Sequence, residues 1–374
     1  MEQPSLWNPT FVTSVTAMFD NDHKGYLLIM HGGAGTMSRE GSTPEQRVRY
    51  KMGIRAALEA GYAVLRSGGE AMDATVATVS VLEDNPLFNA GKGAVFNVAG
   101  KNELETSLML SKPPATGDTG IPVSRRGVGI TLLSHVKNPS KLARALYMAP
   151  TLLPHTFISG PTAELLAESL GEELVPSSYF FTKQRWIEHR RGLGLPDDDE
   201  KIGEELPLLD LQPTGTVGAV ALDIRGCIAS LTSTGGRTNK LVGRIGDTPH
   251  MGSGFWAEQW PSSTGWVNRL LDRIRGTSSE QAVGISGTGD GDYFIRCSTA
   301  VTIAHRVRYL GESLQKAADY AVNELRENGG IGGIIALDNQ KNAVFALNCP
   351  GMYRGIIRED GVPLTAIFDD DILE

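Results

Sequence analysis

The sequence has few cysteines and no long apolar run. Its 374 residues include only three cysteines, Cys227, Cys297 and Cys349, which are too few for a framework of paired disulfides. We therefore expect buried, reduced thiols and a cytoplasmic location. The N-terminal residues lack the basic start and apolar stretch of a signal peptide, and no segment approaches the length that spans a bilayer. The sequence thus gives no reason to expect a membrane partner.

Positive charge is also in short supply. Lysine and arginine total 35 residues against 43 aspartates and glutamates, so the formal net charge is −8 at pH 7. A nucleic-acid-binding surface needs a basic excess to displace the counterions of the phosphates. No nucleic-acid partner is therefore expected.

Several motifs of metal and cofactor enzymes are missing. In "NAGKGAVF", Lys92 is followed by glycine, where a phosphate-binding loop carries serine or threonine. The seven histidines lack the spacing of a catalytic zinc site, and no Gly-X-Ser-X-Gly elbow occurs. "GTGDGDYF" contains Asp290 and Asp292 but lacks the remaining ligands of a calcium loop. We expect no cofactor for catalysis.

Helical and strand patterns are both present, in both halves of the chain. Helices are predicted over residues 45–67, in the segment after it that contains Met72, Val76 and Val79, and over 312–328. Apolar hairpins are predicted at 216–234 and 332–348, and a strand–loop–strand at 282–296. Between about 183 and 215, the composition suits a flexible connector. Antiparallel hairpins flanked by helices predict a layered α+β fold.

Glycine is abundant, and one threonine lies between two glycines at the mouth of a predicted strand. In "PTGTVGAVALD", Gly215 and Gly218 flank Thr216 and Val217 where the connector meets the strand. A glycine in a strand usually marks a close approach by backbone or ligand. The simplest interpretation is still a strand start, because serine and threonine often satisfy nearby backbone groups. The stretch predicts either an ordinary strand start or a threonine that another group must reach.

Thr216 has a base available if the chain is cut before it. A threonine hydroxyl is a weak nucleophile without a neighbouring base. An α-amino group, with a pKa near ~7.7–8.0, is such a base, and it exists only on the first residue of a chain. Cleavage between Gly215 and Thr216 would create it. The uncut chain would then be an inactive zymogen.

These motifs together resemble one family. "HGGAG", "LEDNPLFNAGKGAVF", "GTVGAVALD", "STGGRTNKLVGRIGDTPHMGSG" and "GTGDGDYFIR" are similar to the plant-type (type 2) asparaginase/isoaspartyl peptidase family, whose members are N-terminal-nucleophile hydrolases. The likeness extends from His31 to Arg296 in the order of the family. It implies a single domain folded as a four-layer αββα sandwich, made of two antiparallel sheets covered by helices. It also implies an autoprocessing amidohydrolase that acts on C–N bonds, cleaving L-asparagine and β-aspartyl dipeptides.

The resemblance implies a role for each matching residue. Thr216 would be the nucleophile, and the chain would separate into an α-subunit, 1–215, and a β-subunit, 216–374. Thr234 would hydrogen-bond the Thr216 hydroxyl. The oxyanion hole would comprise Thr288, Gly289 and Asn89. The aspartyl α-carboxylate and α-amino group would be held by Arg244, Asp247 and Gly291.

Two further expectations follow from the family. A structural sodium ion would be held by backbone carbonyls of Leu82, Glu83, Asn85, Phe88, Ala90 and Lys92. The processed enzyme would be a homodimer of αβ heterodimers. Neither expectation has a side-chain signature in this sequence.

The chemistry of the residues agrees with part of this assignment. A free amino acid carries one negative and one positive group. An arginine fork suits its carboxylate, and a second carboxylate suits its ammonium group. The alternative for Arg244 and Asp247 is a surface ion pair three residues apart, which would contribute little. Glycines on both sides make a regular exposed helix improbable there, so the sequence favours a binding site.

The sequence departs from the family at three places. Glu105 and Thr106 stand where aspartate and alanine are typical, and His250 and Met251 replace aliphatic residues. Asp290 and Asp292 also put acidic side chains beside the predicted oxyanion donors, where an added carboxylate raises the pKa of its neighbours. These changes bear on substrate preference and rate.

Three alternatives stay open. A glycosylasparaginase resembles a chain with an Asp-Thr cleavage site and "STNG", whereas this chain has Gly215-Thr216 and "STGG". A threonine endopeptidase of the taspase kind would need an open cleft for a folded peptide. A non-cleaving relative that only binds its ligand would retain the same residues.

Overall fold

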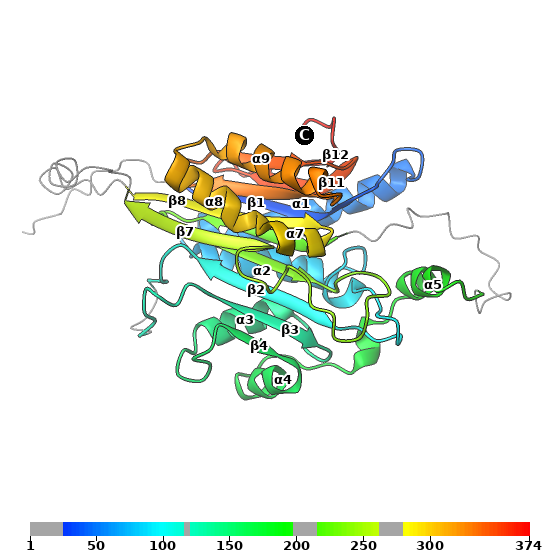
Figure 1. The fold of residues 1–374 in the computed structure, drawn as a ribbon. Coiled ribbons are helices and arrows are strands. Elements are labelled where there is room, and N and C mark those ends of the chain that lie inside the picture. Colours follow the sequence, from blue (N-terminus) through cyan, green and yellow to red (C-terminus); the bar gives the residue numbers. More distant parts are fainter. Residues whose placement is uncertain (1–24, 116–119, 197–214, 262–279) are drawn as a thin grey trace, which may run out of the picture.

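The computed structural model describes residues 25–115, 120–196, 215–261 and 280–374. The part of the predicted connector at 197–214 lies outside the described residues. The described residues contain both helices and strands, in both halves of the chain (Figure 1). None of the helices within the described ranges is both long enough and apolar enough to cross a bilayer.

Two sheets form the centre of the described structure. The larger has eight strands in the order β12-β11-β1-β5-β6-β2-β3-β4, and the smaller has four in the order β10-β9-β8-β7. Neighbouring strands are antiparallel except for β3 and β4. The strands of the large sheet are β1 Leu27–Gly35, β2 Leu104–Leu110, β3 Gly127–Leu133, β4 Phe157–Ser159, β5 Val217–Leu222, β6 Ile228–Thr234, β11 Gly351–Ile357 and β12 Pro363–Phe368. Those of the small sheet are β7 Phe255–Pro261, β8 Glu280–Gly289, β9 Gly332–Asp338 and β10 Ala343–Leu347.

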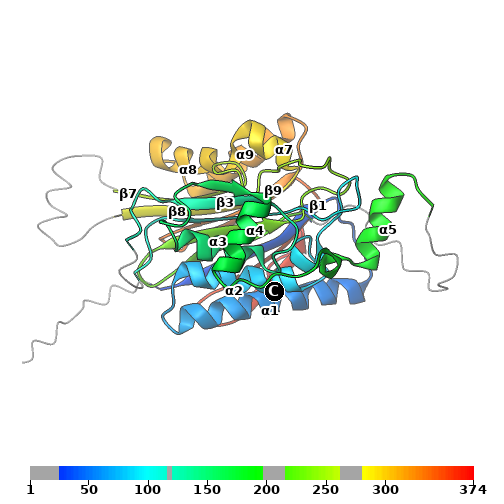
Figure 2. The same ribbon diagram turned by 90° about the horizontal axis from the view of Figure 1, so that it is seen from below.

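Helices cover the outer faces of both sheets. Figure 2 shows α1 and α2 on one side of the strands and α8 and α9 on the opposite side. The helices are α1 Pro44–Arg66, α2 Ala71–Asp84, α3 Pro139–Tyr147, α4 Gly160–Ser169, α5 Lys183–Gly192, α7 Gly291–Cys297, α8 Thr299–Leu310 and α9 Leu314–Glu327, with short 3-10 turns at η1 Gly91–Gly93 and η2 Ser177–Phe180. The order helix, sheet, sheet, helix confirms the predicted four-layer α+β sandwich.

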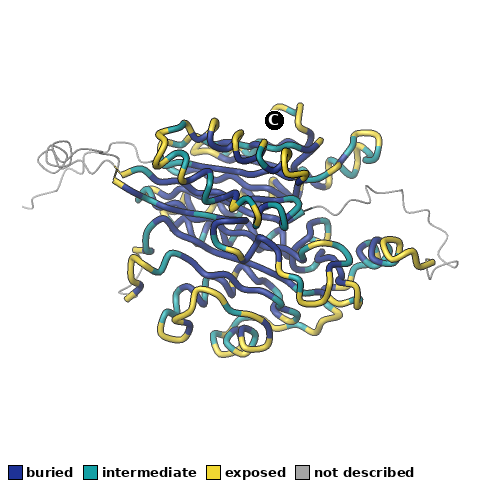
Figure 3. The backbone as a smooth tube through the Cα atoms, in the orientation of Figure 1, coloured by how far each residue is buried: buried dark blue, intermediate teal, exposed yellow. Residues whose placement is uncertain are grey.

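Alternation along the strands explains the layers. In β1, Leu28 and Met30 pack in the cluster under α1 and α2, whereas Leu27 and Ile29 pack in the cluster between the two sheets. Successive strand residues point to opposite faces, so a strand buried on both faces reads as one apolar run. Figure 3 accordingly shows the strands buried along most of their length, and exposed residues mainly in helices and loops.

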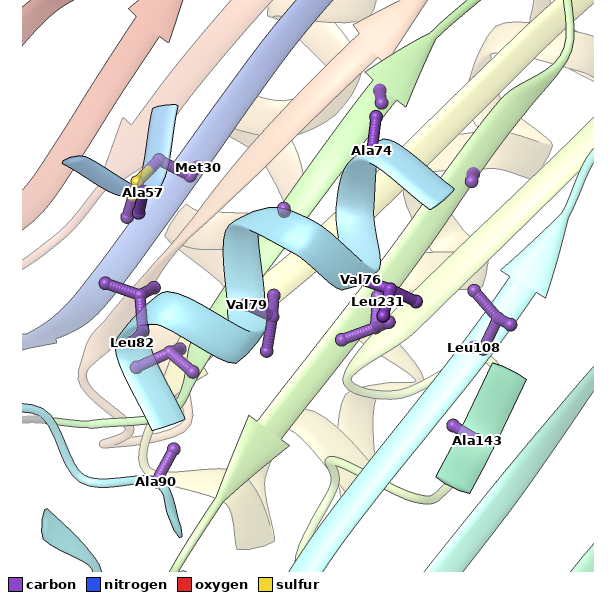
Figure 4. Packing of buried hydrophobic residues seen from close by; sticks show 14 of the residues in the cluster. Met30, Ala57, Ala74, Val76, Val79, Leu82, Ala90, Leu108, Ala143 and Leu231 are labelled. Atoms are coloured by element: carbon purple, nitrogen blue, oxygen red, sulfur yellow. The ribbon is translucent and has the colours of Figure 1, made fainter. Parts of the chain in front are cut away.

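The first two helices pack on the large sheet through apolar side chains. Thr43 caps α1 in a capping box with Gln46. Each of the two side chains accepts a hydrogen bond from the backbone amide of the other residue. Helix α2 is buried along most of its length. Figure 4 shows Val76 and Val79 of this helix close to Leu231 on β6. This packing fixes the ends of β5 and β6, where the candidate site lies.

Most of the predicted elements are confirmed, and two are wrong. The hairpins β5–β6 and β9–β10 and the helices α1, α2 and α9 lie where the sequence predicts them. The second strand predicted within 282–296 is instead helix α7, because Phe294 is buried among the apolar residues of α8 and α9. Tertiary packing here overrides the strand preference of its aromatic and branched residues.

The connector begins later than predicted. Residues 183–192 form helix α5, whose N-terminus is capped by Thr182. Arg185 is buried, pairs with Glu188 at 2.9 Å and donates to the carbonyl oxygen of Gly93 at 2.9 Å. Because this helix is anchored to the loop after α2, residues 183–192 are part of the packed structure.

Candidate active site

Several strand ends meet at one cavity of about 120 Å³. Strand β5 begins there, and β1, β6 and β8 end there. Since Val217 pairs with Ser233, Thr216 lies at the same end of the hairpin as Thr234. The cavity is lined by Ala34, Gly35, Thr36, Asn89, Glu105, Gly215, Thr216, Thr234, Gly236, Arg237, Arg244, Asp247, Gly289, Asp290, Gly291 and Ile331. The structure thus brings nearly all the predicted catalytic and substrate-binding residues to one place.

Thr216 is buried and held through its carbonyl group. His31 Nδ1 lies 2.9 Å from the Thr216 carbonyl oxygen, and His31 Nε2 lies 2.7 Å from Ser286 Oγ. A carbonyl oxygen only accepts, so Nδ1 carries the proton and Nε2 accepts from the serine. Burial lowers the pKa of His31 to about 3, although its bond to Thr216 opposes the shift. The histidine is therefore neutral and fixed in one tautomer.

The threonine hydroxyl contacts a residue that the sequence analysis did not single out. Thr216 Oγ1 lies 3.3 Å from Thr248 Oγ1, and both residues are buried. Thr248 belongs to "GRIGDTP", but nothing in that motif distinguishes a structural threonine from one that meets Thr216. Thr234 lines the same cavity, and its hydroxyl accepts from the Gly236 amide at 2.9 Å. The hydrogen bonds of the described residues do not include the predicted one between Thr234 and Thr216.

The bond before Thr216 lies against two predicted oxyanion donors. A Cβ added at Gly215 would lie 2.5 Å from Thr288 Oγ1 and 3.3 Å from the Gly289 amide nitrogen. Real side chains do not approach this closely, so only glycine fits without movement of Thr288. Thr288 is buried at the end of β8, and its Oγ1 accepts from the Ala34 amide at 3.2 Å.

Asn89 is held in a single orientation at the wall of the cavity. Its Nδ2 donates to the Gly236 carbonyl oxygen at 2.7 Å, and its Oδ1 accepts from the Val95 amide at 3.1 Å. The backbone carbonyl oxygen of Asn89 accepts from the Gly235 amide at 3.0 Å. These bonds join the loop after α2 to the end of β6.

Arg244 and Asp247 face the same part of the cavity. Asp247 is buried, and its Oδ2 has no hydrogen-bond partner among the described residues. Burial raises the pKa of Asp247 to about 7, and nearby Arg244 opposes this shift. A Cβ at Gly291 would lie 2.2 Å from Asp247 Oδ1 and 3.3 Å from Arg244 Nη2. The three predicted binding residues therefore converge through Asp247 Oδ1, whereas Oδ2 lies against Gly254.

Glu105 supports this binding loop from beneath. The Gly246 amide donates to Glu105 Oε1 at 3.0 Å and lies 3.2 Å from Oε2. Burial raises the pKa of Glu105, while Lys240, the Gly246 amide and Arg244 lower it. The longer acid at this departure thus reaches the backbone between Arg244 and Asp247.

The other departures have separate partners. Asp292 accepts from Arg244 Nη2 at 3.0 Å, and Asp290 lies 3.5 Å from Arg237 Nη1. His250 Nδ1 lies 2.8 Å from Ser253 Oγ. The two aspartates therefore face the arginines of the cavity.

The predicted sodium loop turns several carbonyls inward. A Cβ at Gly91 would lie 2.4 Å from the Glu83 carbonyl oxygen, and one at Gly93 would lie 2.1 Å from that of Phe88 and 2.6 Å from that of Pro86. These carbonyls lie at two separate glycines, and backbone carbonyls are ligands that suit a hard cation. The carbonyls of Leu82, Asn85, Phe88 and Ala90 each accept a loop amide as well. Among the described residues, no cluster of histidine, cysteine or carboxylate side chains suits a metal.

Comparison with known proteins gives consistent matches over most of the chain. The family described as "Asparaginase" matches residues 24–277 and 274–367. The chain is 35% identical to the isoaspartyl peptidase of Escherichia coli (strain K12) over 347 residues, which cover 91% of this chain and 96% of the relative. It is 31% identical to the isoaspartyl peptidase/L-asparaginase of Xenopus laevis over 338 residues, or 89% and 93% of the two chains. For the mouse protein of the same name (Mus musculus), the identity is 34% over 316 residues, or 83% and 82%. The chain therefore belongs to the asparaginase family.

Proposed function

We propose that this protein cuts its own chain between Gly215 and Thr216 and then hydrolyses L-asparagine and β-aspartyl dipeptides through Thr216. The observation that carries the proposal is the position of Gly215 and Thr216. They line one cavity with Gly289, Arg244 and Asp247, and Gly215 lies against Thr288. The names of the relatives, isoaspartyl peptidase and L-asparaginase, support the same activity.

The first reaction is self-cleavage. The Thr216 hydroxyl oxygen attacks the Gly215 carbonyl carbon, the C–N bond breaks, and the nitrogen of Thr216 takes up the proton. The resulting ester is hydrolysed by water, which leaves a carboxylate on Gly215 and a free α-amino group on Thr216. Because the amide nitrogen of the uncut chain is not basic, the catalytic base appears only after this step.

Turnover then follows the same path with an external amide. The α-amino group of Thr216 accepts the proton of its own hydroxyl, whose oxygen attacks the side-chain carbonyl of the aspartyl group. The C–N bond breaks, and ammonia or an amino acid leaves with that proton. Water hydrolyses the aspartyl ester and regenerates the threonine.

The surrounding residues bind the charges that this path requires. Thr288, the Gly289 amide and Asn89 face the developing oxyanion, and one such donor typically contributes about 3 kcal/mol to transition-state stabilisation. In the cut form, Thr234 hydrogen-bonds to the Thr216 hydroxyl and orients it. Arg244 binds the α-carboxylate, and the carboxylate of Asp247, whose Oδ1 lies beside Gly291 in the cavity, accepts from the α-amino group.

The assembly follows from the cut. We infer that an α-subunit of residues 1–215, whose connector follows helix α5, stays associated with a β-subunit of residues 216–374, and that two such heterodimers pair. The three cysteines, all free in the structure, support a reducing, cytoplasmic setting. Sodium held by the loop of Leu82 to Lys92 would keep Asn89 in place and take no part in the reaction.

Mass spectrometry of the purified protein tests the cut. We expect fragments of 215 and 159 residues, the second beginning at Thr216. Thr216→Ala should neither cut nor hydrolyse, whereas Thr216→Ser, which keeps the hydroxyl, should do both more slowly. A wild-type chain that stays intact on incubation would favour the binding-only relative.

A substrate panel tests the specificity. We expect ammonia from L-asparagine and leucine from β-Asp-Leu. Preference for a glycosylated asparagine would favour the glycosylasparaginase alternative, and cleavage of a folded protein substrate would favour the endopeptidase.

A further inference from the structure

A second arginine lies at the cavity, apart from the one that faces Asp247. Arg237 follows β6, and the cavity that contains Thr216 is lined by both Arg237 and Asp290. The side chain of Arg237 is 62% exposed, whereas that of Arg244 is 19% exposed. Arg237 therefore lies at the solvent side of the cavity and Arg244 lies deeper.

Arg237 and Asp290 come from opposite walls. Arg237 belongs to the loop after β6 in the large sheet, beside Gly236, whose carbonyl oxygen is held by Asn89. Asp290 lies at the junction of β8 and α7, on the small sheet. The 3.5 Å approach of Arg237 Nη1 to Asp290 Oδ1 thus links the two sheets at the mouth of the cavity.

Within the described residues, Asp290 is the one partner of the Arg237 guanidinium, so most of its donors remain available to a ligand. Arginine has five N–H donors in a planar fork, and an Nη–Oδ approach of 3.5 Å is long for a charge-assisted hydrogen bond. The exposed pair itself contributes little to stability. Asp290 thus contacts one end of the fork from the opposite wall.

The two substrate classes differ in their number of carboxylates. Asparagine has one carboxylate and one ammonium group, for which Arg244 and Asp247 suffice. A β-aspartyl dipeptide has a second carboxylate, on the amino acid that leaves. That group lies beyond the scissile bond, away from the aspartyl groups that Arg244 and Asp247 would bind. The cavity offers a second, more exposed arginine for it.

We propose that Arg237 binds the terminal carboxylate of the leaving amino acid, so that the site favours β-aspartyl dipeptides with a free C-terminus. This inference rests on the hydrolytic function proposed above. It makes Arg237 a specificity-determining residue that has no part in the bond-breaking steps.

The test compares β-Asp-Leu with its C-terminal amide, which differs only in the charge that Arg237 would bind. In the wild-type protein, kcat/KM should be about tenfold higher for the acid than for the amide, as expected for one charge-assisted hydrogen bond. Arg237→Gln should bring this ratio close to one. Arg237→Lys, which keeps the charge without the fork, should give an intermediate ratio.

Two controls make the result specific. Arg326→Gln removes an exposed arginine from the last turn of α9, away from the cavity, and should keep the wild-type ratio. Self-cleavage of each variant, followed by mass spectrometry, reports on folding. A wild-type ratio near one, or the same ratio in Arg237→Gln as in wild type, would overturn the assignment of Arg237 and leave the hydrolytic function standing. A wild-type protein that hydrolyses neither these dipeptides nor asparagine would overturn both.

Discussion

The imidazole of His31 donates from Nδ1 to the carbonyl oxygen of Thr216 across 2.9 Å. The histidine is fully buried, and its burial favours the neutral form. Its second nitrogen accepts from Ser286, so protonation would reverse that bond and place a charge between the two sheets.

Acid should therefore weaken the fold through His31. The folded-state pKa of about 3 lies below the ordinary 6.5, so the unfolded chain takes up a proton that the folded chain does not. This contribution to stability is complete above about pH 6.5 and is lost as the pH falls toward 3, by at most about 1.4 kcal/mol per pH unit. Urea unfolding between pH 4.5 and 7.5 measures it.

The matched variant for this measurement is His31→Gln, which keeps a donor but does not titrate. Other groups titrate in both proteins and cancel in the difference between them. The stability advantage of the wild type over His31→Gln should shrink as the pH falls. Parallel curves over that range would contradict a buried, neutral histidine.

Gly215→Ala should slow self-cleavage without altering turnover. The added methyl group would lie 2.5 Å from Thr288 Oγ1 and so displace a donor that the cleavage needs. Once cut, residue 215 is a chain terminus outside the reaction. We expect at least about a tenfold slower appearance of the fragments. Activity per cut molecule, obtained by titrating free Thr216 termini, should equal that of wild type; a proportional loss of both would show a general disruption.

Gly291→Ala should lower turnover without slowing self-cleavage. Its methyl group would lie 2.2 Å from Asp247 Oδ1 and 3.3 Å from Arg244 Nη2, so the binding groups must move while Gly215 and Thr216 stay in place. We expect normal fragments but a fall in kcat/KM of about 100-fold, the usual effect of disturbing a buried charged contact. Steady-state kinetics on asparagine measures it. A near-normal kcat/KM would show that the α-carboxylate and α-amino group of the substrate do not bind at Arg244 and Asp247.

Asp247→Asn should make the protein more stable and less active. Burial raises the pKa of Asp247 from 3.8 to about 7, so ionising it costs stability, beginning above pH 3.8 and completely above pH 7. The neutral amide removes this cost. We expect the Tm to rise by a few degrees at pH 8 and to match wild type near pH 4, and kcat/KM to fall by about 100-fold.

The control for this gain is Asp292→Asn. The Asp292 side chain is 42% exposed, and its charge is already hydrated, so no rise in Tm at pH 8 is expected. A similar rise in both variants would reflect the net charge of −8 instead of the burial of Asp247.

The sequence predicted the layers and the residues of the cavity because those depend on local patterns. Apolar runs define β5 and β6, and glycine-rich stretches mark "GTVG" and "GTGDG" at strand ends and "GRIGD" in the loop between β6 and β7. Helix α7 escaped prediction, and the connector was placed too early over α5, because contacts from distant segments determine both helices. Arg185 bonds to Gly93, and Phe294 packs under α8 and α9.

The partners of Thr216 were beyond the sequence for the same reason. His31 lies 185 residues before Thr216 and 255 residues before Ser286, and Thr248 reaches the Thr216 hydroxyl from another loop. "HGGAG" signalled a backbone-lined site but gave His31 no role. Arg237 is one of many exposed arginines in the sequence, and its place at the cavity follows only from the crossing of the two sheets.

The order of strands in the large sheet has a consequence for the enzyme after the cut. Reading across it, β12 and β11 come from the second fragment, β1 from the first, β5 and β6 from the second, and β2, β3 and β4 from the first. Each fragment's strands are hydrogen-bonded on both sides of the other's, so the halves cannot part while the sheet exists. Unfolding would release two chains where folding began with one. Recovery from denaturation would then depend on protein concentration, and each molecule would have a single opportunity to fold unaided.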